Sequence, residues 1–210
     1  MAILDDISEL LQKGKANDVK QLVQQALDDG IGAKSVLEDG LMSGMGIIGE
    51  KFKNNEIYVP EVLIAARAMN AGIEILRPHL VSAGVEAKGR VVIGTVKGDL
   101  HDIGKNLVKM MMEGKGLEVI DLGTDVSAEK FIQAATENKA QIICCSALLT
   151  TTMTEMKGVV EAAKEAGIRD QVTIMVGGAP VTDNYCKSIG ADIYSPDAAS
   201  ASERALAAVS

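Results

Sequence analysis

Short apolar segments alternate with helix-patterned segments throughout residues 89–210, and this alternation constrains the fold more than any other feature. The apolar segments are rich in Val and Ile and mostly lack polar alternation, as is typical of strands covered on both faces. Strands that alternate with helices form parallel sheets with right-handed crossovers. We therefore predict an α/β domain with a doubly wound, five-stranded parallel sheet. The expected strands are Val91–Val96, Glu118–Leu122, Gln141–Cys145, Val172–Val176 and Asp192–Tyr194.

The intervening segments have the helical spacing of apolar residues. A doubly wound sheet of this size is flavodoxin-like, with helices on both faces. The expected helices are Ile103–Glu113, Ala128–Asn138, Thr152–Ala166, Thr182–Ile189 and Ala198–Val209.

Residues 1–88 carry helical periodicity alone, which indicates a separate domain. Four helical segments with short connections predict a small four-helix bundle, its fourth helix starting near Val59-Pro60 and ending near Pro78. The third, Ala33–Lys53, contains glycines that close packing against another helix or close approach to a flat ligand would explain. Ser82–Gly89 is polar and glycine-containing, and we interpret it as a linker. The glycines are Gly40, Gly44, Gly46 and Gly49.

Composition argues against several classes of partner. Aromatic residues make up 2% of the chain and the net charge is −8, so we expect no nucleic-acid binding. No apolar run approaches the roughly 18–20 residues of a membrane span, and the N-terminus lacks a basic signal-peptide region. We therefore expect a cytoplasmic protein without a membrane partner. Cys144, Cys145 and Cys186 lack metal-binding spacing and should be buried, reduced thiols, with the first two on opposite faces of a strand.

The loop after the first strand contains one of only two histidines in the chain, His101. Ligands of doubly wound sheets bind at the carboxyl ends of the strands, where this loop should lie. Asp99 can accept a hydrogen bond from one ring nitrogen of His101 and leave the other nitrogen for a metal. His101 is therefore a candidate metal ligand.

Two further strand ends carry residues suited to a ligand. Ser146–Thr152 supplies several hydroxyls, and Gly177-Gly178 would let the backbone approach a bulky group. Each pattern has an ordinary explanation: a histidine can be a bystander, hydroxyls before a helix can cap it, and paired glycines can make a turn.

Taken together, the motifs Asp99-x-His101-x-x-Gly104, Ser146-x-Leu148 and Gly177-Gly178 resemble the DxHxxG, SxL and GG fingerprint of cobalamin-binding domains at the family's spacing. Tyr58–Glu61 and Ala65–Met69 are similar to the helical cap that precedes this domain in methyl-transferring members. The resemblance covers essentially the whole chain. It is closest to the corrinoid proteins of bacterial and archaeal methyltransferase systems, and to the cap and B12-binding domains of cobalamin-dependent methionine synthase. It implies a helical cap domain over residues 1–88 and a Rossmann-like cobalamin-binding domain over residues 89–210.

The resemblance also implies residue roles. His101 would be the lower axial ligand of cobalt, Asp99 would hold its other ring nitrogen, and a hydroxyl from the Ser146–Thr152 loop would complete this catalytic relay. Thr152 is favoured by position, and the hydroxyls of Thr150 and Thr151 stay open as alternatives. The loop from Tyr194 to Asp197 would close the far end of the cofactor slot. The implied cofactor-binding residues are Gly98, Asp99, His101, Asp102, Ile103, Gly104, Ser146, Leu148, Thr150, Thr152, Gly177, Gly178 and Tyr194, with Tyr58 and Met69 from the cap.

The implied function is that of a methyl carrier containing cobalamin or a related corrinoid. Such a protein accepts a methyl group on cob(I)alamin from a substrate-specific methyltransferase. It then delivers the methyl group from methylcobalamin to a second methyltransferase, for transfer to tetrahydrofolate or a thiol. The resemblance implies a carrier subunit without turnover of its own, and an ATP-dependent reductive activator as a further partner. The cap would swing aside about the Ser82–Gly89 linker.

Two alternative functions stay open. A small subunit of an adenosylcobalamin mutase would carry the same motifs, although the chain has no room for a catalytic barrel. A B12-dependent regulator would combine a similar cap and domain, although no basic helix-turn-helix is visible. A plain flavodoxin-like or receiver domain would explain the sheet but not the spaced motifs. A hydrolytic metal site is disfavoured because His79, the other histidine, lies in the other predicted domain.

Overall fold

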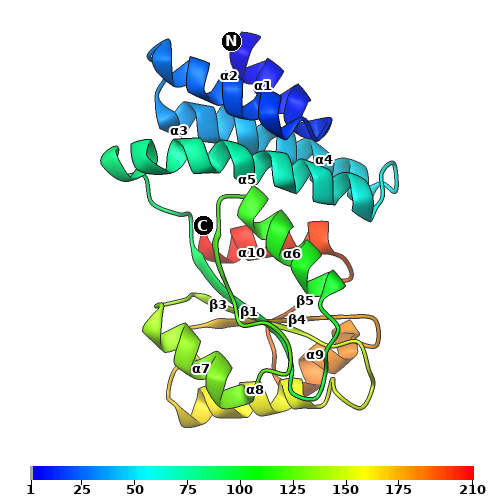
Figure 1. Cartoon of the computed structure of the whole chain (residues 1–210). Helices are drawn as coiled ribbons and strands as arrows, with labels where there is room; N and C mark the ends of the chain where they lie inside the picture. The colour runs from blue at the N-terminus through cyan, green and yellow to red at the C-terminus, as the bar shows by residue number, and fades with distance from the viewer. Residues whose placement is uncertain (1) are drawn as a thin grey trace. The chain divides into compact units, whose positions relative to one another are not determined.

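The computed structural model describes residues 2–210, which fold into two compact units (Figure 1). The helical unit comprises the chain up to Ala87 together with Gly114–Gly116. The sheet unit comprises Lys88–Glu113 and Leu117–Ser210. Along the chain, the division lies beside the predicted boundary at residue 88.

The helical unit buries one apolar stripe from each of its main helices. Leu4, Ile7 and Leu11 of α1 are at most 3% exposed, and α2 and α5 pack against each other through similar stripes. The backbone N–H of Tyr58 donates to Glu61 Oε2 (3.0 Å), which fixes the start of α5. This last helix continues one turn beyond Pro78, to Ser82. The elements are α1 (Ala2–Gln12), α2 (Ala16–Asp28), α3 (Ala33–Ser35), the π-helix η1 (Val36–Met42), α4 (Ser43–Lys53) and α5 (Val59–Ser82).

The third predicted segment, Ala33–Lys53, is helical over its whole length, but it contains a π-helical stretch that the sequence did not predict. A π-helical turn takes up an extra residue within a helical run, and a sequence period of 3.6 residues does not reveal it. A Cβ at Gly40 would lie 3.3 Å from Ile7 Cγ2, and one at Gly44 would lie 2.9 Å from the Ser8 carbonyl oxygen. Close packing against α1 therefore explains these two glycines, whereas a Cβ at Gly46 would meet open space.

The sheet unit has the predicted fold. Its strands are all parallel in the order β2-β1-β3-β4-β5, which is the flavodoxin-like order. The fifth strand is shorter than expected. The elements are β1 (Arg90–Thr95), α6 (Ile103–Gly114), β2 (Glu118–Asp121), α7 (Ala128–Glu137), β3 (Ile142–Ser146), α8 (Glu155–Glu165), β4 (Thr173–Gly177), α9 (Asp183–Ile189), β5 (Ile193–Tyr194) and α10 (Ala198–Val209).

Two hydrophobic cores cover the two faces of the sheet, and Figure 1 shows the helices that lie over each face. Helices α7, α8 and α9 pack on one face, and α6 and α10 pack on the other. Cys145 belongs to the first core and Cys144 to the second, as predicted from the alternation of strand side chains. Burial raises the pKa of the Cys144 thiol to about 12, so it stays protonated. All three cysteines are free and buried, which confirms the predicted thiols.

The register of the sheet aligns three strand ends. Thr95 of β1 pairs with Ser146 of β3, and Ser146 pairs with Gly177 of β4. The loops that follow these three residues therefore leave the sheet at the same level. None of the helices in residues 2–210 combines the length and the apolar character that crossing a membrane requires.

Gly44 and Gly46 of α4 have different surroundings, and this difference predicts opposite effects of substitution on stability. Gly44→Ala should lower the free energy of unfolding by about 1–3 kcal/mol, because the new methyl group would press on the α1 backbone. Gly46→Ala should raise it by roughly 0.5–1 kcal/mol, since Ala is the better helix former. Denaturant unfolding of both variants checks this, and equal effects would contradict the packing argument.

Candidate functional site

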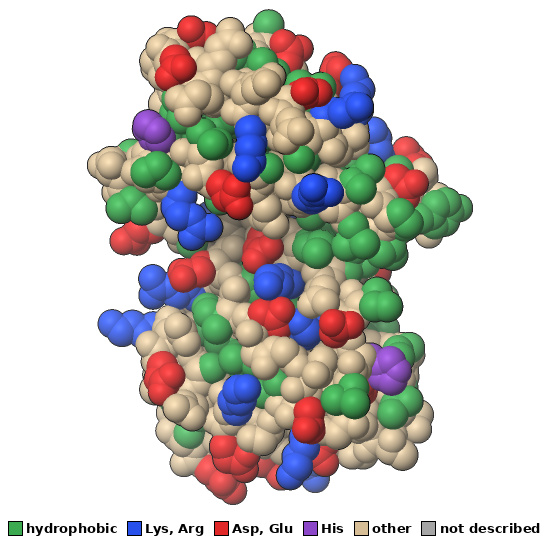
Figure 2. Space-filling view, in the orientation of Figure 1, with side chains coloured by type: hydrophobic (Ala, Val, Ile, Leu, Met, Phe, Trp, Pro, Cys, Tyr) green, Lys and Arg blue, Asp and Glu red, His purple; other side chains and the backbone are tan. Residues whose placement is uncertain are grey.

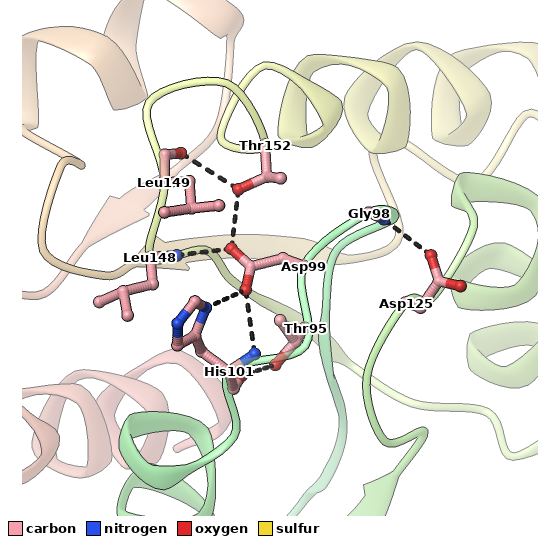
Figure 3. A network of polar contacts seen from close by, with 8 residues as sticks. All are labelled: Thr95, Gly98, Asp99, His101, Asp125, Leu148, Leu149 and Thr152. Carbon is pink, nitrogen blue, oxygen red and sulfur yellow. Dashed lines mark hydrogen bonds and ion pairs between the residues drawn. The ribbon is translucent and has the colours of Figure 1, made fainter.

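The carboxylate of Asp99 joins the loops that follow β1 and β3 (Figure 3). The residue is fully buried. Its Oδ1 accepts the backbone N–H of His101 (3.0 Å) and lies 2.8 Å from His101 Nδ1. Its Oδ2 accepts the backbone N–H of Leu148 (2.8 Å) and the hydroxyl of Thr152 (2.7 Å). One side chain thus holds both loops in a fixed relation.

The same hydrogen bonds keep Asp99 charged. Burial by itself would raise the pKa of this carboxyl, but the bonds from Leu148, Thr152 and His101 outweigh it and hold the pKa well below its usual range. A carboxylate can only accept, so the hydrogen bond to His101 requires the proton on Nδ1. The lone pair of a neutral His101 then lies on Nε2, which has no hydrogen-bond partner among residues 2–210. The imidazole, whose side chain is 53% exposed, is therefore prepared to give one nitrogen ligand to a metal.

Hydrophobic side chains surround this imidazole. Leu100 and Ile103 flank His101 and are each 74% exposed, while Leu148 and Leu149 are each 43% exposed. The space-filling view shows hydrophobic side chains gathered beside the histidine of the sheet unit (Figure 2). Grouped exposed apolar residues mark a binding surface more than scattered ones do. These side chains therefore form an apolar surface beside the candidate metal ligand.

The ends of β4 and β5 form a second part of the site. Gly178 has φ +132°, and a Cβ there would lie 1.8 Å from the carbonyl oxygen of Ala147. A Cβ at Gly177 would lie 3.3 Å from the carbonyl oxygen of Ser195. Among residues 2–210, the buried hydroxyl of Ser195 has no hydrogen-bond partner. A buried hydroxyl left in this state costs free energy, so a polar group of a ligand would satisfy it.

The structure brings together the predicted residues of three loops. Asp99, His101, Leu148 and Thr152 form one hydrogen-bonded cluster, which Gly98 joins through Asp125, and Ser146 and Gly177 are paired at the adjoining strand ends. The expected contact between Asp99 and His101 is present. Their roles toward a cofactor stay predictions.

The hydroxyl that contacts Asp99 is that of Thr152, whereas Thr150 is exposed. We expected this helix to begin at Thr152, but α8 begins at Glu155. The contact of Thr152 with Asp99 explains the later start. Because the Thr152 hydroxyl contacts both Asp99 and the carbonyl of Leu149 (3.1 Å), residues around it form a turn before the helix.

Other predicted residues lie outside this cluster. Asp102 accepts from Asn106 Nδ2 (3.1 Å), a Cβ at Gly104 would meet open space, and the carbonyl of Tyr194 accepts from Arg204. In the helical unit, Tyr58 is 68% exposed and Met69 is 2% exposed. Contact of these residues with a cofactor stays a prediction.

Two residues that the structure singles out, Ser195 and Asp125, have no separate role in the predictions from sequence. Ser195 was assigned only to a closing loop, although a serine directly after the last strand was a usable signal. Asp125, which accepts the N–H of Gly98 (2.7 Å), gave no signal in the sequence.

Comparison with known proteins agrees with this geometry. A family model described as a B12 binding domain matches residues 89–206, and a second with the same description matches residues 3–77. The chain belongs to the family of B12-binding corrinoid proteins. It binds a cobalamin-type corrinoid, which the outward Nε2 of His101, the apolar surface around it and the unpartnered hydroxyl of Ser195 all suit.

Several proteins that are similar to this chain are named corrinoid proteins. A corrinoid protein from Desulfitobacterium hafniense is 40% identical over 98% of this chain and 96% of its own length. Trimethylamine corrinoid protein 1 of Methanosarcina acetivorans is 46% identical over 85% of this chain and 83% of its own length. A chain in the crystal structure of the methanol:cobalamin methyltransferase complex MtaBC from Methanosarcina barkeri superposes with a TM-score of 0.89 at 32% identity. That match covers 99% of this chain and 80% of the other.

The lowered pKa of Asp99 makes stability depend on pH. A carboxyl whose pKa is depressed by folding stabilises the fold above its unfolded pKa of about 3.9, and this contribution is lost as the pH falls through the folded value. At pH 7, Asp99→Asn should lower the free energy of unfolding by about 2–3 kcal/mol, through weakened charge-assisted hydrogen bonds. Below about pH 4 the difference from wild type should shrink.

Urea unfolding of the cofactor-free protein between pH 7 and pH 3 measures this difference. Asp102→Asn is the matched control, because Asp102 is exposed and contacts Asn106 on the surface. The control should change stability by less than about 0.5 kcal/mol. A loss in Asp99→Asn that did not vary with pH would show that charge is not what Asp99 contributes.

Proposed function

We propose that this protein is a corrinoid methyl carrier. It accepts a methyl group from a substrate-specific methyltransferase and delivers it to a second methyltransferase, for transfer to tetrahydrofolate or a thiol. The observation that carries the proposal is His101, held by a charged Asp99 with Nε2 outward, on a domain that matches the B12-binding family. The relatives are corrinoid proteins named for methylamines or found with a methanol methyltransferase, which favours a methyl carrier over a mutase subunit or a regulator.

The cofactor supplies the reactive metal, a cobalt centre that can take up a methyl group and give it up again. His101 would hold the cobalt through Nε2. Asp99 keeps the proton on Nδ1 and so presents the Nε2 lone pair. Thr152 and the N–H of Leu148 hold Asp99 in turn. Leu100, Ile103 and Leu148 would cover the apolar underside of the macrocycle.

His101 would be able to hold either the cobalt or a proton at Nε2. In either case the Asp99 carboxylate, which stays charged, would hold the other ring nitrogen, Nδ1.

The helical unit has a proposed role as well. We propose that it covers the methyl-bearing face of the cofactor, with Tyr58 and Met69 as contacts, and that residues 82–89 act as its hinge. The segment lies between the end of α5 at Ser82 and the start of β1 at Arg90. We propose partners of three kinds: a methylamine or methanol methyltransferase, a second methyltransferase, and an ATP-dependent reductive activator.

Electron paramagnetic resonance of the protein reconstituted with cob(II)alamin tests the ligand. One nitrogen-14 ligand splits each cobalt line into a triplet, and protein labelled with nitrogen-15 histidine should give doublets. His101→Ala should lose the isotope effect, whereas His79→Ala, in the helical unit, should keep it. If the wild-type protein labelled with nitrogen-15 histidine still gave triplets, a nitrogen from outside the protein's histidines would bind cobalt.

The relay gives a second, graded prediction. Thr152→Val removes the hydroxyl from Asp99, and histidine ligation should weaken by roughly 10-fold, as for other residues that support a metal ligand. Thr152→Ser, which keeps a hydroxyl, should restore it. Thr150→Val is the control and should leave ligation unchanged. The ratio of histidine-bound to unbound cofactor, read from absorption spectra, measures the effect, and equal ratios in all variants would remove Thr152 from the relay.

Transfer of the methyl group tests the function itself. The reduced holoprotein is mixed with methyltransferases specific for trimethylamine, dimethylamine or methanol and their substrates, and methylation of the cofactor is followed by absorption. At least one pair should methylate the cofactor, with the unmatched pairs as controls. Failure of every pair, in a protein shown to bind corrinoid through His101, would argue for the mutase or regulator alternative.

A further inference from the structure

We propose that Asp125 is a positioning residue for His101, acting through Gly98 and Asp99 from the loop that follows β2. The inference rests on the proposed binding of cobalt by His101. It adds a third loop to the two that Asp99 already joins.

Asp125 contacts the loop that follows β1 and carries His101, here called the ligand loop. It does so through both its side chain and its backbone (Figure 3 shows the side-chain contact). Its Oδ1 accepts the backbone N–H of Gly98 at 2.7 Å. Its own N–H donates to the carbonyl oxygen of Asp99 at 3.0 Å. The two bonds fix the peptide group that precedes Gly98 and the peptide group that follows Asp99, one on each side of this pair of residues. The direction of the Asp99 side chain, and hence the place of His101, depends on these peptide groups.

The loop that carries Asp125 is itself held firmly. Gly123 donates its N–H to Asp121 Oδ1 (2.9 Å) and accepts the N–H of Thr95 (2.9 Å). Val126 donates its N–H to the carbonyl oxygen of Thr95 (3.0 Å). Residues 123–126 thus extend the sheet alongside the end of β1. Asp125 is therefore a fixed support and not a side chain on a free loop.

A partly buried ion pair holds the start of this support. Lys105 of α6 is 2% exposed, and its Nζ lies 2.6 Å from Asp121 Oδ1. Buried lysines are rarely found without a partner, and breaking such a pair is costly. Helix α6, which begins two residues after His101, is thereby tied to the same loop. The ligand loop is held from its N-terminal side by Asp125 and from its C-terminal side through Lys105.

The backbone at Asp125 narrows the choice of residue there. Its φ is +54°, a left-handed conformation that Gly, Asn and Asp adopt more readily than other residues. Among these three, Asp and Asn also place an acceptor oxygen on the N–H of Gly98. Asp125→Asn therefore preserves both features, while Asp125→Gly preserves the conformation and removes the acceptor.

The experiment compares these two variants in the full-length chain, with Asp170→Gly as a control for added backbone freedom at an exposed turn of the sheet unit. Amide hydrogen exchange of Gly98 is measured without cofactor. Histidine ligation is measured with cob(II)alamin and nitrogen-15 histidine. Asp125→Gly should speed exchange at Gly98 and reduce the ratio of histidine-bound to unbound cobalt, each by roughly 10-fold, the effect of losing one hydrogen bond. Asp125→Asn and Asp170→Gly should stay within about 2-fold of wild type.

Wild-type ligation with normal Gly98 exchange in Asp125→Gly would overturn the inference. Faster exchange with unchanged ligation would also overturn it, because Asp125 would then support the loop without placing His101. Absence of the histidine isotope effect in the wild type would instead reject the proposed cobalt ligand. The two failures are therefore distinguishable.

Discussion

The buried carboxylate of Asp99 is the interaction on which the site depends. It accepts bonds from two loops that are far apart in sequence, and these bonds outweigh the burial that would otherwise favour its neutral form. Because it stays charged, it determines which nitrogen of His101 carries the proton. The ring nitrogen that is left without a proton, Nε2, is thus selected by a group that is itself shielded from solvent. Without that carboxylate, His101 would be one more exposed histidine.

The sheet makes this arrangement available. Parallel strands end at one edge, and the pairing of Thr95 with Ser146 and of Ser146 with Gly177 aligns the three loops. The first of these loops carries the histidine, and the second supplies the hydroxyl and the N–H that hold Asp99. The third offers a glycine backbone beside the carbonyl of Ser195, whose buried hydroxyl has no hydrogen-bond partner among residues 2–210. The short β5 completes the edge where that hydroxyl lies.

Predictions from sequence were wrong where tertiary contacts replace local preference. The period of the third helical segment could not reveal a π-helical turn, since that turn accompanies the close contact of Gly40 and Gly44 with α1. Thr152 looked like the start of a helix, but its hydroxyl bonds Asp99, 53 residues away in the chain. Asp125 carries no local pattern at all, because its function comes from lying beside Gly98.

The sequence by itself determined the strands and their order of appearance, the two-part organisation, the family and the candidate ligand, because apolar periodicity and motif spacing are properties of the chain. Only the tertiary structure decided which threonine contacts Asp99 and which nitrogen of His101 faces outward. It also decided that the loop after β2 contacts the loop that carries His101. These depend on distances between residues that the fold brings together. A hydrogen bond across 27 or 53 residues leaves no periodic trace in the sequence, although it fixes the chemistry of the site.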